Sequence, residues 1–311
     1  MIETKKIKLE ELKSKLKSNP ADSRARKQLA FALLDENLPE EALKQFNYLL
    51  GIFPDDASIY FNTGIIYEKL KMPQAAEHAY FKAIELSPDD ADSTYNLAFL
   101  YDQQGNINKA IEYYQKTLRL DPEDANTYFN LACLYSKLNK SDKAIKYYEK
   151  AIKLNPADTY AHFYLAYEYK KTAQPDKALL EYEEVIKINP KYSWAFYNMA
   201  CVYFEKGNIE KAVENLKTTI EINPKDTAAY KTLASVFVTI KDYDSAINIL
   251  EDAGIHNTEN GDLHCTMAQL HQKLNNNEDA FFHYQKALEF SHNLSFSKDQ
   301  IKNELKKLKI K

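Results

Sequence analysis

The 311-residue chain has the composition of a charged soluble protein, with 45 % apolar residues, 28 % charged residues and a formal net charge of −4. Both ends are rich in lysine, so the acidic charge lies in the middle, which argues against nucleic acid as a partner. The first residues lack the apolar run of a signal peptide, and no stretch is apolar over the length of a membrane span. Three cysteines, an odd number without close spacing, fit a reducing compartment. We therefore expect a cytoplasmic protein without membrane insertion.

Residues 1–22 predict a capping helix. Ile2, Leu9, Leu12 and Leu16 fall near helical spacing, and lysine occupies many of the other positions. Because no second helix precedes it, we expect this helix to close the front of the structure that follows.

A proline then returns every 34 residues. Apolar residues run up to an Asn, Asp or Ser, the proline follows, and an Asp or Asn comes next, as in AIELSPDDA and TLRLDPEDA. Each copy predicts the end of one helix, a turn and the capped start of the next helix. Seven prolines belong to this series: Pro20, Pro54, Pro88, Pro122, Pro156, Pro190 and Pro224.

The remaining prolines share a second place in the same register. Pro39, Pro73 and Pro175 each stand 15 residues before a position of the main series and predict the first turn of a second helix, where proline loses no hydrogen bond. Gly105 and Gly207 fall two residues before that place, where a tight turn between helices needs glycine. Each repeat is therefore predicted to be two helices joined by a short turn.

The register predicts eight such repeats over residues 23–294, followed by a capping helix at 295–311 that carries Ile301, Leu305 and Leu308 on one stripe. We place the repeats at 23–56, 57–90, 91–124, 125–158, 159–192, 193–226, 227–260 and 261–294.

The repeats share an apolar signature. The first helix carries a quartet such as Tyr60, Thr63, Gly64 and Tyr67, and the second carries an alanine in all eight copies. This length and pattern resemble the tetratricopeptide repeat (TPR), with its signature W-x2-L-G-x2-Y, A-x3-F and P. The resemblance implies an all-α fold, a right-handed α-solenoid or superhelix of helix-turn-helix repeats whose first helices line the concave face. It says little about function, because the fold hosts many partners.

The first helices carry two further rows, which we expect roughly opposite the quartet and facing the concave side. The aromatic row is Phe61, Tyr95, Phe129, Phe163 and Tyr197, and the next residues are Asn62, Asn96, Asn130 and Asn198, with Tyr164 in the fifth repeat. An Asn amide can pair with the backbone of an extended peptide. Similarity to TPR proteins that hold peptides by an asparagine row, such as O-linked N-acetylglucosamine transferase and the peroxisomal targeting-signal receptor, implies a peptide-binding role for these residues. The alternative is that the rows only bridge adjacent helices.

The same face is expected to carry charges and further rings. Tyr167 and Trp194 are predicted apolar contacts, and the charged residues are Glu68, Asp102, Lys137 and Lys170. Acids lie toward the second and third repeats and bases toward the fourth and fifth, so a ligand with basic and acidic ends would be oriented by them.

No catalytic motif stands out. The chain has no phosphate-binding glycine loop, and its carboxylates are scattered over helix exteriors. His264 and His271 stand seven apart with His283 on the next helix, but they occupy aromatic positions of the register, so we interpret them as core residues rather than a metal site. We expect no enzyme activity and no cofactor.

The sequence therefore predicts a monomeric, non-catalytic scaffold or adaptor that binds an extended peptide or a partner helix of another protein in a concave groove over the second to sixth repeats. Two alternatives remain open. One is a regulatory or substrate-presenting subunit for a separate enzyme, such as a glycosyltransferase or a secretion component. The other is a self-assembling scaffold.

Overall fold

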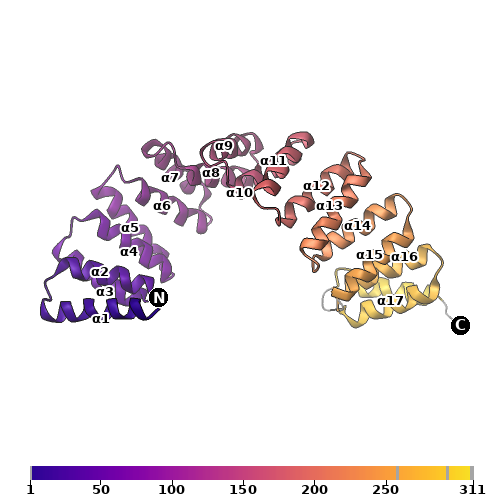
Figure 1. The fold of residues 1–311 in the computed structure, drawn as a ribbon, viewed down its shortest axis with the longest axis horizontal. Coiled ribbons are helices and arrows are strands. Elements are labelled where there is room, and N and C mark those ends of the chain that lie inside the picture. Colours follow the sequence, from indigo (N-terminus) through magenta and orange to yellow (C-terminus); the bar gives the residue numbers. More distant parts are fainter. Residues whose placement is uncertain (1, 257–258, 292–293, 309–311) are drawn as a thin grey trace. The chain divides into compact units, whose positions relative to one another are not determined.

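The structure, a computed structural model, describes residues 2–256, 259–291 and 294–308, without the side chains of 2–8, 255 and 256. These residues form eighteen helices and no strand (Figure 1). The chain divides into two compact parts, residues 1–156 and 157–311, which we call the N-terminal half and the C-terminal half. Each half is described by itself, and the predicted right-handed superhelical course stays a prediction.

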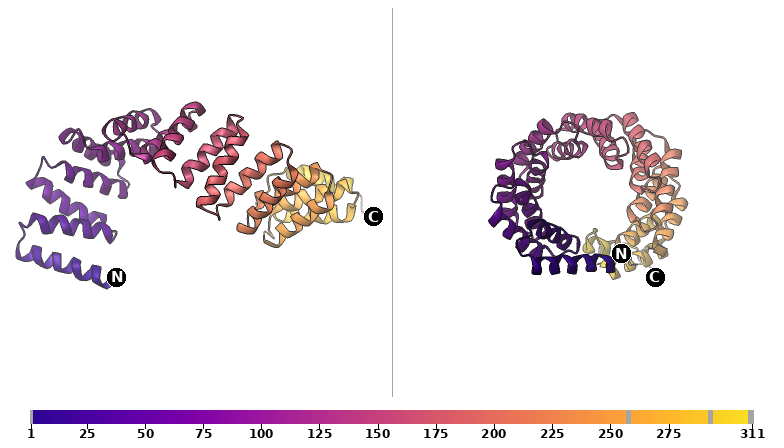
Figure 2. Two further views of the ribbon diagram at one scale, coloured as in Figure 1. Left: turned by 45° about the horizontal axis from the view of Figure 1, so that its top comes forward. Right: turned by 60° about the vertical axis from the view of Figure 1, so that its left-hand side comes forward.

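The N-terminal half consists of one helix and four helix pairs (Figures 1 and 2). Leu9, Leu12 and Leu16 of the first helix are buried against the first pair, as a capping helix requires. The helices are α1 (Ile2–Ser18), α2 (Ser23–Asp35), α3 (Pro39–Ile52), α4 (Ala57–Lys69), α5 (Pro73–Leu86), α6 (Ala91–Gln103), α7 (Ile107–Leu120), α8 (Ala125–Lys137) and α9 (Ser141–Leu154).

The C-terminal half has four more pairs and a last helix. Ile301 and Leu308 of the last helix are buried against the eighth pair. The helices are α10 (Thr159–Lys171), α11 (Pro175–Ile188), α12 (Ser193–Glu205), α13 (Ile209–Ile222), α14 (Thr227–Thr239), α15 (Tyr243–His256), α16 (Gly261–Lys273), α17 (Asn277–Glu289) and α18 (Lys298–Lys307). The predicted all-α solenoid of helix pairs with a capping helix at each end is confirmed.

Local signals set the helix boundaries. Pro39, Pro73 and Pro175 each occupy the first position of a second helix, as predicted. Most first helices are capped by an aspartate that accepts a hydrogen bond from a backbone N–H of the first turn, which satisfies one of the otherwise unpaired donors there. These caps are Asp22, Asp56, Asp90, Asp124, Asp158 and Asp226.

The turn within each repeat needs a left-handed backbone. Gly105 and Gly207 have φ of 74° and 76°, which confirms why glycine stands there. The other six repeats adopt the same conformation with residues that tolerate it less well. They are Asn37, Lys71, Asn139, Ala173, Lys241 and Asn275, with φ between 55° and 62°. A left-handed conformation costs an L-residue about 1–2 kcal/mol, so lysine and alanine are strained here.

The core depends on small residues. The recurring alanine of the second helix has no exposed surface in any repeat: Ala42, Ala76, Ala110, Ala144, Ala178, Ala212, Ala246 and Ala280. At Gly64 of α4, an added Cβ would lie 2.5 Å from Cε1 of Tyr80, so even a methyl group would displace that ring. The two helices of a pair approach closely because these positions carry almost no side chain.

A lysine–tyrosine contact recurs at the junction of the two helices. In four repeats, a lysine at the third position of the second helix lies over a tyrosine ring near the end of the first helix. The pairs are Lys109 over Tyr101 at 4.6 Å, Lys143 over Tyr135 at 5.0 Å, Lys177 over Tyr169 at 5.1 Å and Lys211 over Tyr203 at 5.0 Å. Such cation–π contacts contribute about 0.5–1 kcal/mol at exposed sites.

Candidate functional site

The aromatic row of the first helices leans toward the protein interior. Phe61, Tyr95, Phe129 and Phe163 are half-buried, and each ring contacts the buried tyrosine of the second helix in its own repeat. The ring centroids are 6.3, 5.6, 5.8 and 5.7 Å apart, to Tyr80, Tyr114, Tyr148 and Tyr182 respectively. The expectation that this row lies opposite the core was wrong. Phe61 stands three residues before Gly64, and residues three apart share a helix face.

Three of the four predicted asparagines donate a side-chain hydrogen bond within the protein. Nδ2 of Asn62 and of Asn198 donates to a carbonyl of its own helix, at 2.6 Å to Ser58 and 2.8 Å to Trp194. Nδ2 of Asn130 donates to the Tyr95 hydroxyl of the preceding repeat at 2.9 Å, which is the bridging role foreseen as an alternative. Within the described part of the chain, Asn96 forms no side-chain hydrogen bond, and the amide oxygens of the other three accept none. Each amide therefore keeps donor or acceptor capacity.

The predicted charged side chains also form ion pairs or hydrogen bonds within the protein. Lys137 Nζ lies 3.0 Å from Asp102 Oδ1, and Lys170 Nζ lies 3.3 Å from Glu205 Oε1, so both pairs join adjacent repeats. Glu68 accepts a hydrogen bond of 2.5 Å from the Tyr80 hydroxyl, and burial raises the pKa of the Glu68 carboxyl. The predicted gradient of charge is therefore weakened, because ion pairs between neighbouring repeats neutralise three of its four members, Asp102, Lys137 and Lys170.

Four exposed aromatic side chains lie on first helices of the C-terminal half. Tyr160 and Trp194 are 59 % and 57 % exposed, and Tyr167 and Tyr164 are 48 % and 41 % exposed. Tyr160, Tyr164 and Tyr167 follow one another at helical spacing along α10, and Trp194 of α12 occupies the repeat position of Tyr160. We call these four residues the aromatic surface. Lys170 of α10 and Glu205 of α12 lie within ion-pair distance, so the two helices are neighbours.

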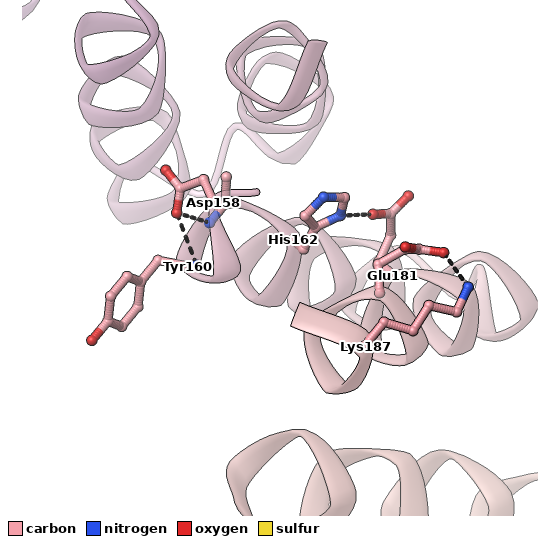
Figure 3. Close-up of polar contacts among 7 residues, drawn as sticks. Asp158, Tyr160, His162, Glu181 and Lys187 are labelled. Atoms are coloured by element: carbon pink, nitrogen blue, oxygen red, sulfur yellow. Dashed lines mark hydrogen bonds and ion pairs between the residues drawn. The ribbon is translucent and has the colours of Figure 1, made fainter. Parts of the chain in front are cut away.

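Local contacts hold α10 in place beneath these rings. Asp158 Oδ1 accepts from the backbone N–H groups of Tyr160 and Ala161 at 2.9 and 3.1 Å, and the Tyr160 ring points away from the surrounding helices (Figure 3). Buried His162 lies 2.7 Å from Oε2 of Glu181 on α11, on the side away from Tyr160 (Figure 3). The three tyrosines of the aromatic surface therefore rest on a capped and anchored helix, α10.

Two aromatic residues of this region were not among the predicted site residues. Tyr192, at the N-cap of α12, lies 6.3 Å from the Tyr160 ring and 5.3 Å from the Phe163 ring. Tyr160 stands four and seven residues before Tyr164 and Tyr167. That spacing alone could have identified Tyr160 as a member of their stripe.

The cysteines and the histidine cluster of the described residues lie in partly or fully buried surroundings. Cys133 and Cys201 are free and half-buried, and burial raises the pKa of both thiols, so the nucleophilic thiolate is disfavoured. His264 and His271 stack on His283 at 5.3 and 5.4 Å. No group of three or more metal-binding side chains is found among the described residues.

Fold and surface together define a helical-repeat protein with exposed side chains on its first helices. Tetratricopeptide-repeat models match residues 57–90, 89–157, 147–179, 170–236 and 261–292. The chain belongs to the tetratricopeptide repeat family. The family's fold is typically a non-catalytic scaffold for interactions with proteins or peptides, and the matches support that general role here.

Solved structures of TPR proteins are also similar to this chain. YrrB, described as a TPR protein with an unusual peptide-binding site, is 28 % identical, with a TM-score of 0.55 over 60 % of this chain and 96 % of its own. MamA is 27 % identical, with a TM-score of 0.52 over 55 % and 94 %. The C-terminal part of a TPR protein from Cytophaga hutchinsonii, at 18 % identity, shares the fold with a TM-score of 0.66 over 74 % and 95 %. No curated protein sequence gives a significant match.

None of the described helices combines the length and the apolar character that crossing a membrane would require.

Proposed function

We propose that this protein is an interaction scaffold that binds an extended peptide or a partner helix on the exposed side of its first helices. The aromatic surface of the C-terminal half would supply most of the affinity. The asparagines at 62, 96, 130 and 198 would pair with the ligand backbone, and the half-buried aromatic row would support them from below.

The exposure of the aromatic surface carries this proposal. Four large rings on two neighbouring helices are 41–59 % exposed, and an exposed apolar patch of this kind often marks an interaction site. Tyrosine and tryptophan provide a large contact area for few rotatable bonds, which is why they dominate many binding surfaces. The likeness to YrrB, whose description names a peptide-binding site, supports a peptide as the ligand class.

The proposal can be tested with a peptide library displayed on phage. The wild type would be compared with two variants, Tyr160→Ala/Tyr164→Ala/Tyr167→Ala/Trp194→Ala and Asn62→Ala/Asn96→Ala/Asn130→Ala/Asn198→Ala. We expect the selected peptides to bind the aromatic variant more than about tenfold less tightly than the wild type, and the asparagine variant to show a smaller loss of affinity. Rings that become buried under the peptide contribute more to binding than amides that stay solvated.

A matched control keeps the test specific. Leu180 and Phe282, 61 % and 51 % exposed on second helices, would be changed to alanine, with circular dichroism confirming that every variant is folded. Equal binding by the wild type and the aromatic variant, or an equal loss in the Leu180→Ala/Phe282→Ala control, would contradict the proposal.

A further inference from the structure

A second, chemically different group of residues lies in the N-terminal half and includes none of the predicted site residues. A pocket of about 500 Å³ opens between α7, α8 and α9. Three tyrosines, three lysines and one glutamine line it, and none of its lining residues is acidic. They are Gln115, Tyr128, Tyr135, Lys143, Lys146, Tyr147 and Lys150.

The tyrosines of this pocket form an ordered wall. The Tyr135 and Tyr147 rings are stacked, with centroids 5.3 Å apart and an angle of 14° between planes, and Tyr128 lies 6.1 Å from Tyr147. Gln115 Nε2 donates to the Tyr135 hydroxyl at 3.4 Å. Burial raises the pKa of Tyr147, so its hydroxyl remains a hydrogen-bond donor at neutral pH.

The fourth repeat carries a combination of lysines at two positions of the second helix that the other repeats lack. Lys150 corresponds to Lys116 in the third repeat, where Glu112 neutralises it at 2.8 Å. In the fourth repeat the position of Glu112 is taken by Lys146, so the acid is replaced by a second base. Lys143 belongs to the recurrent lysine–tyrosine contact. Lysine also occurs at the Lys146 position in the first repeat and at the Lys150 position in the second, third and eighth repeats, but only the fourth repeat has lysine at both positions.

Two of the lysines of the pocket contact tyrosine rings rather than carboxylates. Among the described residues, Lys143, Lys146 and Lys150 form no ion pair with a carboxylate, although Lys143 and Lys150 lie over the Tyr135 and Tyr128 rings at 5.0 and 5.7 Å. Like charges held near one another repel, and this repulsion is relieved when an anion binds between them. In a chain of net charge −4, such a concentration of bases is a local feature.

We propose that this tyrosine–lysine pocket binds an acidic peptide segment of a partner protein. Its carboxylates would pair with Lys146 and Lys150, and an apolar or aromatic side chain between them would pack on the Tyr135 and Tyr147 rings. Tyrosine suits such a mixed contact, because its ring is apolar and its hydroxyl donates a hydrogen bond.

The charge distribution favours a peptide over a nucleic acid. A phosphate backbone gains affinity from many bases spread along its length, whereas here the bases are confined to one pocket. Asp142 and Glu149 on α9 are both exposed and would repel phosphates that extend beyond the pocket. A short acidic peptide can place two carboxylates on the lysines without extending beyond the pocket over these acids.

The test uses the full chain and a fluorescein-labelled peptide of sequence Asp-Glu-Trp-Glu-Asp, followed by fluorescence anisotropy at low and physiological salt. Lys146→Gln/Lys150→Gln is expected to weaken binding by about tenfold, since two partly screened ion pairs together contribute about 1–2 kcal/mol. The control Lys217→Gln/Lys225→Gln makes the same change of net charge at exposed lysines of the C-terminal half and should bind as the wild type does.

Three further measurements decide which kind of ligand binds the tyrosine–lysine pocket. The uncharged peptide Asn-Gln-Trp-Gln-Asn should fail to bind, and the Tyr160→Ala/Trp194→Ala variant should bind the acidic peptide normally, which separates this site from the aromatic surface. Equal affinity for the acidic and the uncharged peptide, or an equal loss in the lysine control, would overturn the proposal. So would tighter binding of a labelled single-stranded oligonucleotide through the same two lysines.

Discussion

The two halves of the molecule contain the same helix pairs but expose different side chains at the same repeat position. At the second position of the first helix, the N-terminal half has Ser58, Asp92 and Asn126, whereas the C-terminal half has Tyr160 and Trp194 in its first two repeats. Four residues later the N-terminal half has three asparagines in succession, and the C-terminal half has Tyr164 and then Asn198. Polar side chains thus occupy in one half the positions that aromatic rings occupy in the other.

This difference shows which positions the fold constrains. The second-helix alanine is fully buried in both halves, because the close approach of two helices leaves no room for a larger side chain. The exposed stripe of the first helix touches fewer neighbours and can change chemistry without loss of packing. A repeat protein can therefore carry different binding surfaces along one unchanged scaffold.

The largest expected effect comes from exchanging the aromatic and the polar side chains at the second position of the first helix between the two halves. Tyr160→Ser/Trp194→Asp gives the C-terminal half the residues that the second and third repeats carry at these positions. Peptides selected by the wild type should bind this variant more than about tenfold less tightly, because two aromatic anchors are lost. The reverse exchange, Ser58→Tyr/Asp92→Trp, should change their affinity by less than about threefold. Titration calorimetry measures both, and similar losses in the two variants would show that the halves do not differ in role.

The second prediction concerns the Tyr80 ring of the N-terminal half. Gly64→Ala should destabilise the protein by about 1–3 kcal/mol, since the new Cβ overlaps the ring that the Glu68 hydrogen bond holds in place. Adding Glu68→Ser releases the ring and should recover part of the loss. The corresponding residues of the fifth repeat are Ala166 and Tyr182, and among the described residues the Tyr182 hydroxyl has no hydrogen-bond partner. Urea unfolding of the single and double variants tests this, and no recovery in the double variant would count against the explanation.

The third prediction is that acid destabilises the C-terminal half first. Burial, with His264 and His271 nearby, lowers the pKa of His283 to about 4, and Asp279 opposes the shift only in part. Because the unfolded chain binds a proton near pH 6.5 and the folded chain only near pH 4, stability should fall as the pH drops between these values. We expect a loss of about 1–2 kcal/mol at pH 4, less than the full shift implies because His283 is partly exposed to solvent.

Amide hydrogen exchange at pH 7 and pH 4.5 can separate the halves in this respect. Protection should decrease first in α16 and α17, and His283→Tyr, which introduces the residue found at this position in the third and fourth repeats, should remove the effect. His78 in the N-terminal half is exposed, so His78→Tyr serves as the control. Equal loss of protection in both halves would contradict the assignment to His283.

The smallest expected effect concerns the left-handed turn residues. Ala173→Gly in the C-terminal half and Lys71→Gly in the N-terminal half should each stabilise the protein by about 0.5–1 kcal/mol, because glycine relieves a strained backbone at some cost in chain entropy. Ala228→Gly within α14 should destabilise it by a similar amount. Thermal melts of the three variants give the sign of each change, and a destabilised Ala173→Gly would refute the argument.

The candidate site was predictable only in part. The position of Tyr164, Tyr167 and Trp194 on exposed first-helix surface followed from their place in the register. The hydrogen bonds of Asn62 and Asn198 to their own helices did not, because an amide chooses between its own backbone and a neighbour by side-chain rotamer. Contacts such as Asp102 with Lys137 join residues 35 apart, one more than the repeat length, and that offset depends on how adjacent first helices cross.

The sequence by itself determined the helix boundaries, the turns and the buried small residues of this protein. These features depend on local chemistry, namely where proline can start a helix, where aspartate can cap one and where only alanine or glycine fits between two helices. The tertiary structure decided which polar and aromatic side chains remain available to a partner. The Glu68 carboxyl turned inward to Tyr80, and within the described part of the chain Lys146 and Lys150 form no ion pair with an acid. Tyr160, Tyr164 and Tyr167 of α10 stayed exposed. Each of these outcomes depends on residues from different helices, whose distances and angles the spacing of residues along one helix does not contain.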